Sequence, residues 1–555
     1  MKPIVSRART KKTRSREKRA EKAAGGHKPL HEHSMVAFLA ALALWATVLM
    51  LLGFEQLMVK WTEGVVFQFI SRGAFLAVGL FAAAMFLYIA SPATLLRNKT
   101  VLLLVMVSLV SLGAMKGVLY FSRISNLVNP DLAVFLLPVA MAPLLATILA
   151  GGTAGLAVGF LTSFALAVFN RGSFTMLCNG MLATVVCAAA AGDVRTRSKV
   201  LKIGIAAGLS KLACLFALTA MNWAISDVMP ILQQALACLG GEFLSAVVVL
   251  LIVPLFEWLF KITTNITLLE LSDLGHPLLQ RLAIEAPGTY HHSLVVANLA
   301  QAAADEIGAN SLLTRVCSYF HDIGKLVKPG FFAENIQLQP NPHDNLPPSM
   351  STLVITSHVK EGLSLALLHN LPECVKNVIQ EHHGTSLLSY FHHKATKQMQ
   401  LDDTGITGGQ TDQPRVDEGT FRYVGPAPTT RESAIIHLAD SVEAASRSME
   451  KTTPGHIENL VRDIVDARIR DGQLDRSQLT FNEVAKIKNS FVFTLTSMLH
   501  GRVAYPKDEN RTKQQATRLQ AVPPAADETG RGVREANERN GRRPRLAGDV
   551  DSSDR

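Results

Sequence analysis

The fold is decided first by QALACLGGEFLSAVVVLLIVPLFEWL, residues 234–259, an apolar stretch with very few charged side chains. A helix needs about 20 apolar residues to cross the hydrocarbon core of a bilayer, so this stretch is long enough to span it. Similar blocks fill most of the chain upstream of it, from residue 35 onward. The predicted spans are residues 35–54, 73–90, 101–121, 132–149, 154–169, 176–191, 203–221 and 234–259. We therefore expect a first transmembrane helix and then a seven-helix transmembrane region over residues 73–262.

Two features of this arrangement have alternatives. Residues 35–54 resemble a signal peptide, but the apolar stretch exceeds the usual length of about 7 to 15 residues and no clear cleavage site follows. We interpret it as a retained span, followed by a short extracytoplasmic segment, residues 55–72. A re-entrant hairpin at Gly151–Gly152 remains an alternative to the two spans on either side of it.

The charge of the chain indicates how it sits in the membrane. The net charge is +10 and the pI about 9.3. Much of the excess lies in a basic N-terminal tail, residues 1–34, which suits anionic lipid at the cytoplasmic face better than nucleic acid, so we expect no DNA or RNA partner. The predicted inner loops hold Arg97, Lys99, Arg195, Arg197, Lys199, Lys202 and Lys261, and the predicted outer loops hold Lys60, Arg72, Arg123 and Arg171. The bias places both ends of the chain in the cytoplasm.

The second half of the chain is predicted to be a soluble, all-α domain over residues 263–505. It begins with a leucine-rich helix, residues 267–283, and alternating strand patterns are scarce. Further helices are predicted at residues 293–307, 312–319, 349–369, 373–383, 432–449 and 483–500. Residues 394–421 are predicted to be an exposed insertion and residues 506–555 a disordered polar tail. The six cysteines form no CxxC pair, which favours buried free thiols.

Histidines and aspartates recur through this domain. The doublets His321-Asp322 and His382-His383 each lie at the end of a predicted helix, where neighbouring side chains can converge. His292, His358 and Asp440 come from separate helices, and His292 is favoured over His291 because it shares a face with Val295, Val296 and Leu299. Imidazoles and carboxylates can hold two divalent cations that activate water against a phosphate ester, with Asp322 as the bridge. The remaining histidines, His343, His369, His392, His393 and His437, are assigned to the surface or to support of the ligands.

The motifs resemble the HD superfamily of metal-dependent phosphohydrolases. The longer strings look like the seven-transmembrane HD family: Ala286-Pro287-Gly288-Thr289-Tyr290-His291-His292-Ser293, His321-Asp322-Ile323-Gly324-Lys325, Asn341-Pro342-His343-Asp344, Glu381-His382-His383-Gly384-Thr385, Phe421-Arg422-Tyr423-Val424-Gly425-Pro426 and Leu438-Ala439-Asp440-Ser441-Val442-Glu443-Ala444. That family includes PgpH-type phosphodiesterases, which hydrolyse cyclic di-AMP to pApA. The resemblance covers residues 267–449.

The resemblance implies an enzyme with a di-iron or di-manganese site in a cytoplasmic HD domain, anchored in a bacterial inner membrane. It assigns one metal to His292, His321, Asp322 and Asp440, and the other to Asp322, His358, His382 and His383. Asp322 and Lys325 are the predicted catalytic residues, although a solvated helix-end lysine is an equal alternative for Lys325. Tyr290, Phe320, Tyr390 and Phe391 are candidate platforms for the adenines, with Lys325, Tyr290 and Tyr390 predicted to bind substrate. The expected partners are a cyclic dinucleotide and the lipid bilayer, with a homo-oligomer left open.

The sequence departs from the family in one respect and leaves other functions open. The family carries a large extracytoplasmic domain after its first span, where this chain has only residues 55–72. The same site could act on cyclic di-GMP, (p)ppGpp or a dNTP, although Gly384 is followed by Thr-Ser-Leu and not by the GYP stretch of cyclic-di-GMP enzymes. A receptor that binds nucleotide without turnover is the non-enzyme alternative. Transport is the third class, because Lys211 and Glu242 lie inside predicted spans.

Overall fold

The computed structural model describes residues 43–44, 47–48, 63–125, 129–170, 172–192, 194–221, 228–336, 340–403, 416–449 and 453–500. The predicted N-terminal tail, most of the first span and the predicted polar tail lie outside these residues. The described part of the chain contains helices, turns and loops and no β-strand, so the all-α prediction is confirmed.

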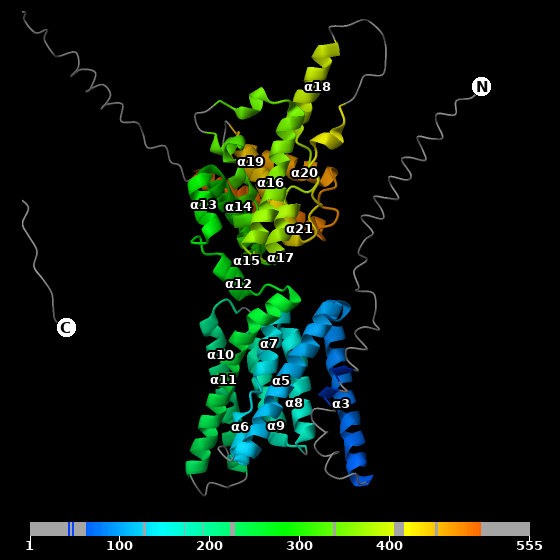
Figure 1. The fold of residues 1–555 in the computed structure, drawn as a ribbon, viewed down its shortest axis with the longest axis vertical. Coiled ribbons are helices and arrows are strands. Elements are labelled where there is room, and N and C mark those ends of the chain that lie inside the picture. The colour runs from blue at the N-terminus through cyan, green and yellow to red at the C-terminus, as the bar shows by residue number, and fades with distance from the viewer. Residues whose placement is uncertain are drawn as a thin grey trace, which may run out of the picture. The chain divides into compact units, whose positions relative to one another are not determined.

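Apolar helices that run side by side make up the membrane part of the chain (Figure 1). They are α3 (Glu63–Ala90), α4 (Pro92–Leu96), α5 (Asn98–Ser125), α6 (Pro130–Leu136), α7 (Met141–Ala150), α8 (Gly152–Phe169), α9 (Phe174–Ala190), α10 (Arg197–Met221) and α11 (Val228–Phe260). Among the described residues, five candidate spans are long and apolar enough to cross a bilayer, and α8 and α9 are shorter apolar helices. The chain is therefore a multi-pass membrane protein, while the count of seven spans in residues 73–262 stays a prediction.

Two predicted borders in the membrane part are corrected by the structure. Helix α3 begins at Glu63, so the predicted extracytoplasmic segment, residues 55–72, is helical from there on. The predicted span over residues 132–149 is broken into α6 and α7, with residues 137–140 outside both helices. Pro138 lies in this break and has no backbone N–H to donate, which is one local reason for the interruption.

A buried ion pair stabilises the break between α6 and α7. The Lys211 ammonium lies 2.9 Å from Glu242 Oε1 and donates to the carbonyls of Phe135 at 2.8 Å and Leu137 at 3.0 Å. Glu242 in turn accepts from the backbone N–H groups of Ala140 at 2.9 Å and Val139 at 3.3 Å. The pair thus supplies partners for backbone groups that lost theirs where the helix stopped, which apolar surroundings require.

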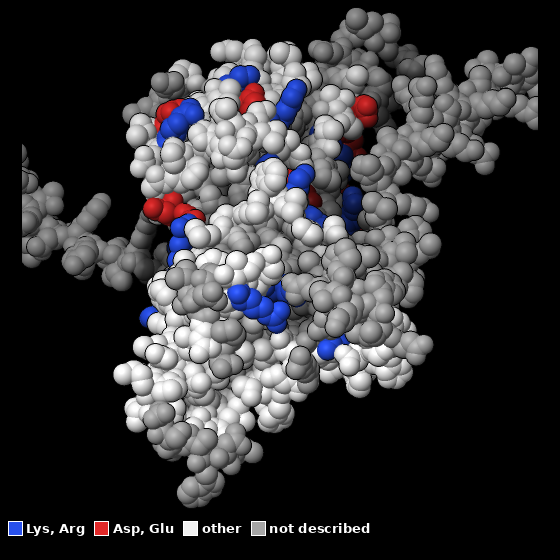
Figure 2. All heavy atoms as spheres, turned by 60° about the horizontal axis from the view of Figure 1, so that its bottom comes forward, with Lys and Arg blue, Asp and Glu red and all other residues white. Residues whose placement is uncertain are grey.

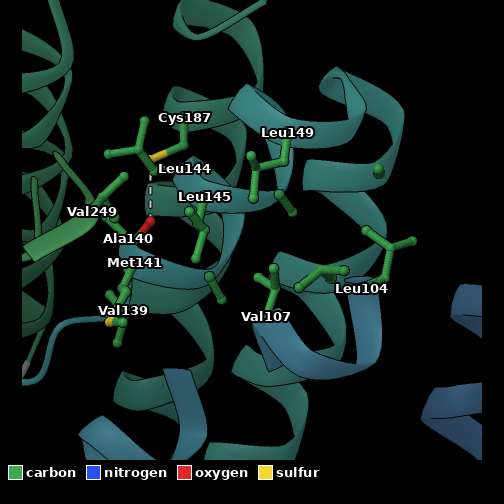
Figure 3. Packing of buried hydrophobic residues seen from close by; sticks show 14 of the residues in the cluster. Leu104, Val107, Val139, Ala140, Met141, Leu144, Leu145, Leu149, Cys187 and Val249 are labelled. Carbon is green, nitrogen blue, oxygen red and sulfur yellow. Dashed lines mark hydrogen bonds between the residues drawn. The ribbon is translucent and has the colours of Figure 1, made fainter. Parts of the chain in front are cut away.

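The helices of the membrane part pack closely around α7. Figure 3 shows Leu144, Leu145 and Leu149 of α7 among side chains of neighbouring helices, with Cys187 of α9 directed at the carbonyl of Ala140. Close approach is also seen beside the break, where a Cβ on Gly241 would lie 2.5 Å from the carbonyl oxygen of Leu136. Small residues at such contacts let membrane helices approach one another, so Gly241 permits the contact of α11 with α6.

The outward surface of the membrane part is apolar. Large side chains such as Phe81, Leu251 and Trp258 are exposed to more than two thirds of their area, at 72%, 75% and 77%. The face of the molecule in Figure 2 includes a broad expanse without Lys, Arg, Asp or Glu. An apolar surface of this extent is unfavourable in water and suits contact with lipid.

The soluble part is a helical domain with a separate apolar core. Its helices are α12 (Asn265–Leu271), α13 (Pro277–Glu285), α14 (Pro287–Glu306), α15 (Ser311–Phe320), α16 (Pro348–Leu368), α17 (Glu373–Glu381), α18 (Ser389–Asp403), α19 (Arg431–Ser446), α20 (Pro454–Arg470) and α21 (Phe481–His500). Short 3-10 turns are η2 (Ile323–Val327), η3 (Pro329–Phe331), η4 (Ala333–Asn335), η5 (Pro342–Asn345) and η6 (Glu418–Phe421). Helices α14, α15 and α19 pack together around the core.

Two predictions for the soluble part were wrong in their borders, and one helix was not predicted. The leucine-rich segment, residues 267–283, is two helices, because His276 caps a new helix that has Pro277 in its first turn. The predicted insertion, residues 394–421, begins inside α18 and ends at Phe421, which is buried. The sequence analysis also missed α20, although Ile457, Val461 and Val465 recur at intervals of four and are all buried.

Candidate metal centre

The first ligand doublet lies where α15 ends. The Asn310 side chain caps the start of α15 by accepting from the Leu313 N–H, and the helix stops at Phe320. His321 and Asp322 follow in irregular backbone before η2 begins, and both are fully buried. Next to them, a Cβ on Gly324 would lie 1.8 Å from the carbonyl oxygen of His358. Only glycine allows this approach, which brings α16 and its His358 up to Asp322.

The structure brings all seven predicted ligands into two adjoining groups. Within each group, the ligand atoms lie within 4.8 Å of one another. One group is His292, His321 and Asp440, and the other is Asp322, His358, His382 and His383. His292 and not His291 is the buried member of its pair, as predicted. The side chains come from α14, α16, α19 and the irregular segments that follow α15 and α17.

Asp322 faces both groups at once. Its Oδ2 lies 3.3 Å from His321 Nε2 and 3.5 Å from His292 Nε2. Its Oδ1 lies 3.4 Å from His358 Nε2 and 3.5 Å from His382 Nε2. One carboxylate can therefore offer an oxygen to each group, which fits the bridging position predicted for it.

The histidine rings are oriented by hydrogen bonds on the nitrogen that faces away from the centre. Three of the rings donate from Nδ1–H to a backbone carbonyl. His321 donates to Ser318 at 2.6 Å, His358 to Ile355 at 2.6 Å, and His382 to Ile379 at 2.9 Å. His292 Nδ1 forms a short bond to the Glu443 carboxylate. Such contacts fix the tautomer and leave the Nε2 lone pair for a metal, as is usual for histidine ligands.

Some inward-facing atoms lack hydrogen-bond partners among the described residues. His321 Nε2 and Asp322 Oδ1 are buried without a hydrogen bond, whereas Asp322 Oδ2 faces Lys325 and His292 Nε2 lies 3.0 Å from Asp440 Oδ1. His358 Nε2 and His382 Nε2 face each other at 3.3 Å, and both rings already use Nδ1 as the donor. In the neutral tautomers that these Nδ1 contacts favour, both Nε2 atoms carry a lone pair, and a cation near them would stabilise the arrangement. The residues therefore fit a pair of metal ions.

The electrostatics of the site agree with this fit. Burial lowers the pKa of His358 to about 4, so its imidazole is neutral and free to donate a lone pair. Burial alone would lower the pKa of His292, but hydrogen bonds to Asp440 and Glu443 raise it to about 9. Burial would raise the pKa of the Asp322 carboxyl, but the nearby Lys325 and His321 outweigh burial and hold this pKa well below its usual range. The carboxylates are thus ionised, and the charge that favours a proton on His292 would equally favour a metal cation.

Several supporting residues hold the ligands in place. Glu443 accepts from Arg447 Nε at 2.8 Å through one oxygen and contacts His292 through the other. His437 donates from Nδ1 to the carbonyl of His382 at 2.7 Å, so it supports the second doublet. The ring of Tyr423 stacks on His383 with centroids 4.2 Å apart.

Lys325 lies at the edge of the cluster and is 9% exposed, which contradicts the alternative of a solvated helix-end lysine. Its ammonium lies 2.7 Å from Asp322 Oδ2 and 2.8 Å from Glu334 Oε1. It also lies over the ring of Phe332, 5.1 Å from the centroid. Its charge thus stays beside the shared carboxylate.

A cavity of about 660 Å³ opens beside the cluster. Ligands, charged side chains and two aromatic rings line it: His292, Lys325, Phe332, Ala333, Glu334, Ile355, His358, His383, Ser386, Leu387, Leu388, Tyr423, Asp440, Ser441, Glu443, Ala444, Ala445, Arg447, Ser448 and Arg468. Its volume lies within the range of pockets for small organic ligands, about 300 to 1,000 Å³. The cluster therefore faces a space in which a phosphate ester can bind.

The predicted aromatic platforms are corrected by this lining. Phe320 is fully buried in the core against His276, and Phe391 is buried against His343. Tyr390 is 65% exposed on α18, and Tyr290 packs against the apolar core. Neither tyrosine is among the described residues that line the cavity, and Phe332 and Tyr423 are the aromatic rings there.

Sequence reasoning assigned no role to several residues of the site: Glu334, Tyr423, Glu443, Arg447 and Arg468. A signal existed for Glu443, which follows Asp440 by three residues and so shares its helix face. Arg468 follows the buried Val465 by the same interval on α20, a helix the analysis missed. Glu334 and Tyr423 come from irregular segments, where no periodicity predicts the direction of a side chain.

Comparison with known proteins agrees with the two-part architecture. The family described as a 7TM receptor with intracellular HD hydrolase matches residues 66–264, and the HD domain family matches residues 289–445. The chain is 34% identical over 455 residues to "Cyclic-di-AMP phosphodiesterase PgpH" of Bacillus subtilis, covering 80% of this chain and 61% of that protein. It is 36% identical over 439 residues to the protein of the same name from Listeria monocytogenes, covering 77% and 58%.

A solved structure was also found, "Crystal Structure of L. monocytogenes phosphodiesterase PgpH HD domain in complex with Cyclic-di-AMP". It is 42% identical in sequence, with coverage of 40% of this chain and 98% of that one, and its TM-score is 0.37. The chain spans about three fifths of the length of the curated relatives it matches.

Fold and site together define a class: multi-pass membrane proteins that carry a helical domain with a histidine and aspartate cluster. Within this class, the chain belongs to the family of seven-transmembrane receptors with an intracellular HD hydrolase domain.

Proposed function

We propose that this chain is a membrane-anchored phosphodiesterase that uses two metal ions to hydrolyse cyclic di-AMP to pApA and so lowers the level of a second messenger. The observation that carries the proposal is the pair of buried nitrogens, His358 Nε2 and His382 Nε2, which face each other at 3.3 Å while Nδ1 of each ring faces a backbone carbonyl. A cluster that needs cations, beside a cavity that suits a nucleotide, favours hydrolysis of a phosphate ester. The named substrate of the curated relatives supplies the substrate of this proposal.

The two groups of ligands give each side chain a role. One ion would be held by His292, His321 and Asp440. The other ion would be held by His358, His382 and His383, and Asp322 would contact both ions. Manganese or iron suits such a set of nitrogen and oxygen ligands without thiolate. When bound, two such ions activate a water and neutralise charge that develops on the phosphate.

The chain's own residues act around that centre. Lys325 holds its positive charge beside Asp322, where it can attract a phosphate oxygen into the cavity. Glu443 and the carbonyls of Ser318 and Ile355 keep the imidazoles pointed inward, so the site is organised before the substrate binds.

We place the catalytic domain in the cytoplasm and the helices in a bacterial inner membrane. Basic side chains flank the predicted inner ends of the spans, among them Arg97, Lys99, Arg195 and Lys202. Such a bias marks the cytoplasmic side of a membrane protein. The domain would then meet a cytoplasmic dinucleotide directly.

The test is turnover by the full-length protein in detergent micelles with Mn²⁺ and cyclic di-AMP, followed by chromatography of the nucleotides. We expect pApA from the wild type and a rate lower by on the order of 1,000-fold from Asp322→Ala, which removes the shared ligand. Asp463→Ala, an exposed carboxylate of α20, is the matched control and keeps the wild-type rate.

Two outcomes would contradict the proposal. Tight binding of cyclic di-AMP without any product, at full metal content, would instead indicate a nucleotide receptor. Faster cleavage of cyclic di-GMP or (p)ppGpp than of cyclic di-AMP would move the substrate to another nucleotide while leaving the metal centre in place.

A further inference from the structure

Two arginines line the cavity, and their surroundings differ. Arg447 forms an ion pair with Glu443, its Nε lying 2.8 Å from Oε1, and this carboxylate also holds His292. Arg468 forms no ion pair with any residue that the structure describes. Its single hydrogen bond among those residues runs from Nε to Ser441 Oγ at 3.2 Å. Arg447 is therefore occupied as a support of the metal centre, whereas Arg468 lines the cavity and forms no hydrogen bond from its two terminal NH₂ groups among the described residues.

The position of Arg468 is set by the core of the domain. Ile457, Val461 and Val465 bury one face of α20 against α19, and Arg468 lies one turn further on along that face. Ser441 holds the guanidinium from the other side, because its hydroxyl accepts from Nε and donates to the carbonyl of His437 at 3.0 Å. Ser441 also follows the predicted ligand Asp440 directly in α19. The guanidinium is thus fixed relative to the metal centre.

A guanidinium held in this way suits a phosphate. Its planar fork matches two oxygens of one phosphate group, and it remains charged in partly buried surroundings. Burial lowers the pKa of Arg468, while the charges of Asp440 and Asp471 oppose that shift. A partly buried guanidinium without a carboxylate in ion-pair contact is unfavourable, and an anionic ligand would relieve this cost.

From these contacts we propose that Arg468 binds the phosphate of the dinucleotide that is not being cleaved. The inference rests on the proposed function, because a cyclic dinucleotide has two phosphodiesters and only one of them can lie at the metal centre at a time. The second phosphate then needs a cation elsewhere in the same cavity, and Arg468 is the cavity arginine that forms no ion pair with a described carboxylate. Arg468 selects substrates with two phosphates over simple phosphodiesters.

The test compares a substrate that has two phosphates with one that has a single phosphate. Full-length wild type, Arg468→Ala and Arg468→Lys are assayed in detergent micelles with Mn²⁺ on cyclic di-AMP and on bis(p-nitrophenyl) phosphate, with metal content measured in parallel. Arg468→Ala should raise KM for cyclic di-AMP by about 10- to 100-fold, the usual range for a lost charged hydrogen bond. It should leave kcat, the rate on the single-phosphate ester and the metal content within about twofold of wild type, because the metal ligands are untouched.

Two further variants keep the result interpretable. Arg468→Lys retains the charge without the fork, so its KM should lie between those of wild type and Arg468→Ala, and it carries the test if the alanine variant does not fold. Arg462→Ala is the matched control, since Arg462 lies on the same helix but points to solvent, 2.6 Å from Glu458.

Three results would overturn the inference. The first is an unchanged KM for cyclic di-AMP in both Arg468→Ala and Arg468→Lys. The second is an equal loss of activity on both substrates together with a reduced metal content, which would mean that Arg468 supports the metal centre. A wild-type protein that cleaves the single-phosphate ester but not cyclic di-AMP would overturn the proposed function together with this inference.

Discussion

The membrane part and the soluble part both bury charged side chains, but they treat them differently. In the membrane part, the Lys211 ammonium has three oxygen partners within 3.0 Å, and the Glu242 carboxylate accepts from two backbone N–H groups as well. In the soluble part, Asp322 Oδ1 and His321 Nε2 are buried without a hydrogen bond among the described residues. A buried charge whose partners all come from the protein stabilises a conformation. Buried ligand atoms without partners indicate that something else binds there.

The largest expected effect tests the membrane side of this comparison. Lys211→Met would leave the Glu242 carboxylate buried without its cation and the carbonyl of Phe135 without its side-chain donor, while the carbonyl of Leu137 keeps the Val139 N–H at 2.9 Å. We expect the free energy of unfolding to fall by about 3 to 5 kcal/mol, measured by denaturant unfolding of the purified protein in detergent. Lys202→Met, at an exposed position of the same helix, should change it by less than about 0.5 kcal/mol.

A companion variant separates charge from hydrogen bonding. Lys211→Met combined with Glu242→Gln removes the unpaired charge but still leaves backbone groups at the break without partners, so it should recover only part of the loss. If Lys211→Met were as stable as wild type, the ion pair would not stabilise the broken helix.

The second prediction concerns the atoms without partners. If they bind metal, Mn²⁺ should stabilise the folded protein by mass action, by about 2.7 kcal/mol at a hundredfold excess over its dissociation constant. A thermal unfolding series over Mn²⁺ concentration measures this. Lys211→Met should show the same gain from its own lower baseline, because the two sites share no partner. An equal gain in Asp322→Ala would mean that the metal binds elsewhere.

The third prediction addresses how the ligands are oriented. Glu443→Gln weakens the acceptor that holds His292 Nδ1, and loss of such a contact typically lowers metal affinity by about 10- to 100-fold. Competition for Mn²⁺ against a chelating dye measures the affinity. Glu458→Gln, at an exposed carboxylate of α20, should leave the affinity unchanged. Equal affinities for all three proteins would show that His292 is held by packing alone.

Whether the sequence predicts a structural feature of this protein depends on how far apart in the sequence the residues that determine the feature lie. Apolar length and helical periodicity are local, so most of the described membrane helices and soluble helices could be located from the sequence, although α3 begins at Glu63 and not at residue 73. Metal-binding residue types were equally visible, since clustered histidines and aspartates such as His321-Asp322 and His382-His383 are unusual in a helical domain. The helix α20 was missed although its period of four was present, which was an oversight and not a limit of the sequence.

Only the tertiary structure decided the features that depend on contacts between distant residues. The span over residues 132–149 is apolar throughout, and the partners that stabilise its break are Lys211 and Glu242, which lie 31 residues apart in sequence and are distant from Leu137. The division of the two Asp322 oxygens between two histidine groups, and the anchoring of Arg468 on Ser441, likewise follow from packing among α15, α16, α19 and α20. Composition and periodicity determine which side chains are present and which face they occupy, whereas the partners that remain for each polar atom are settled only when the helices pack.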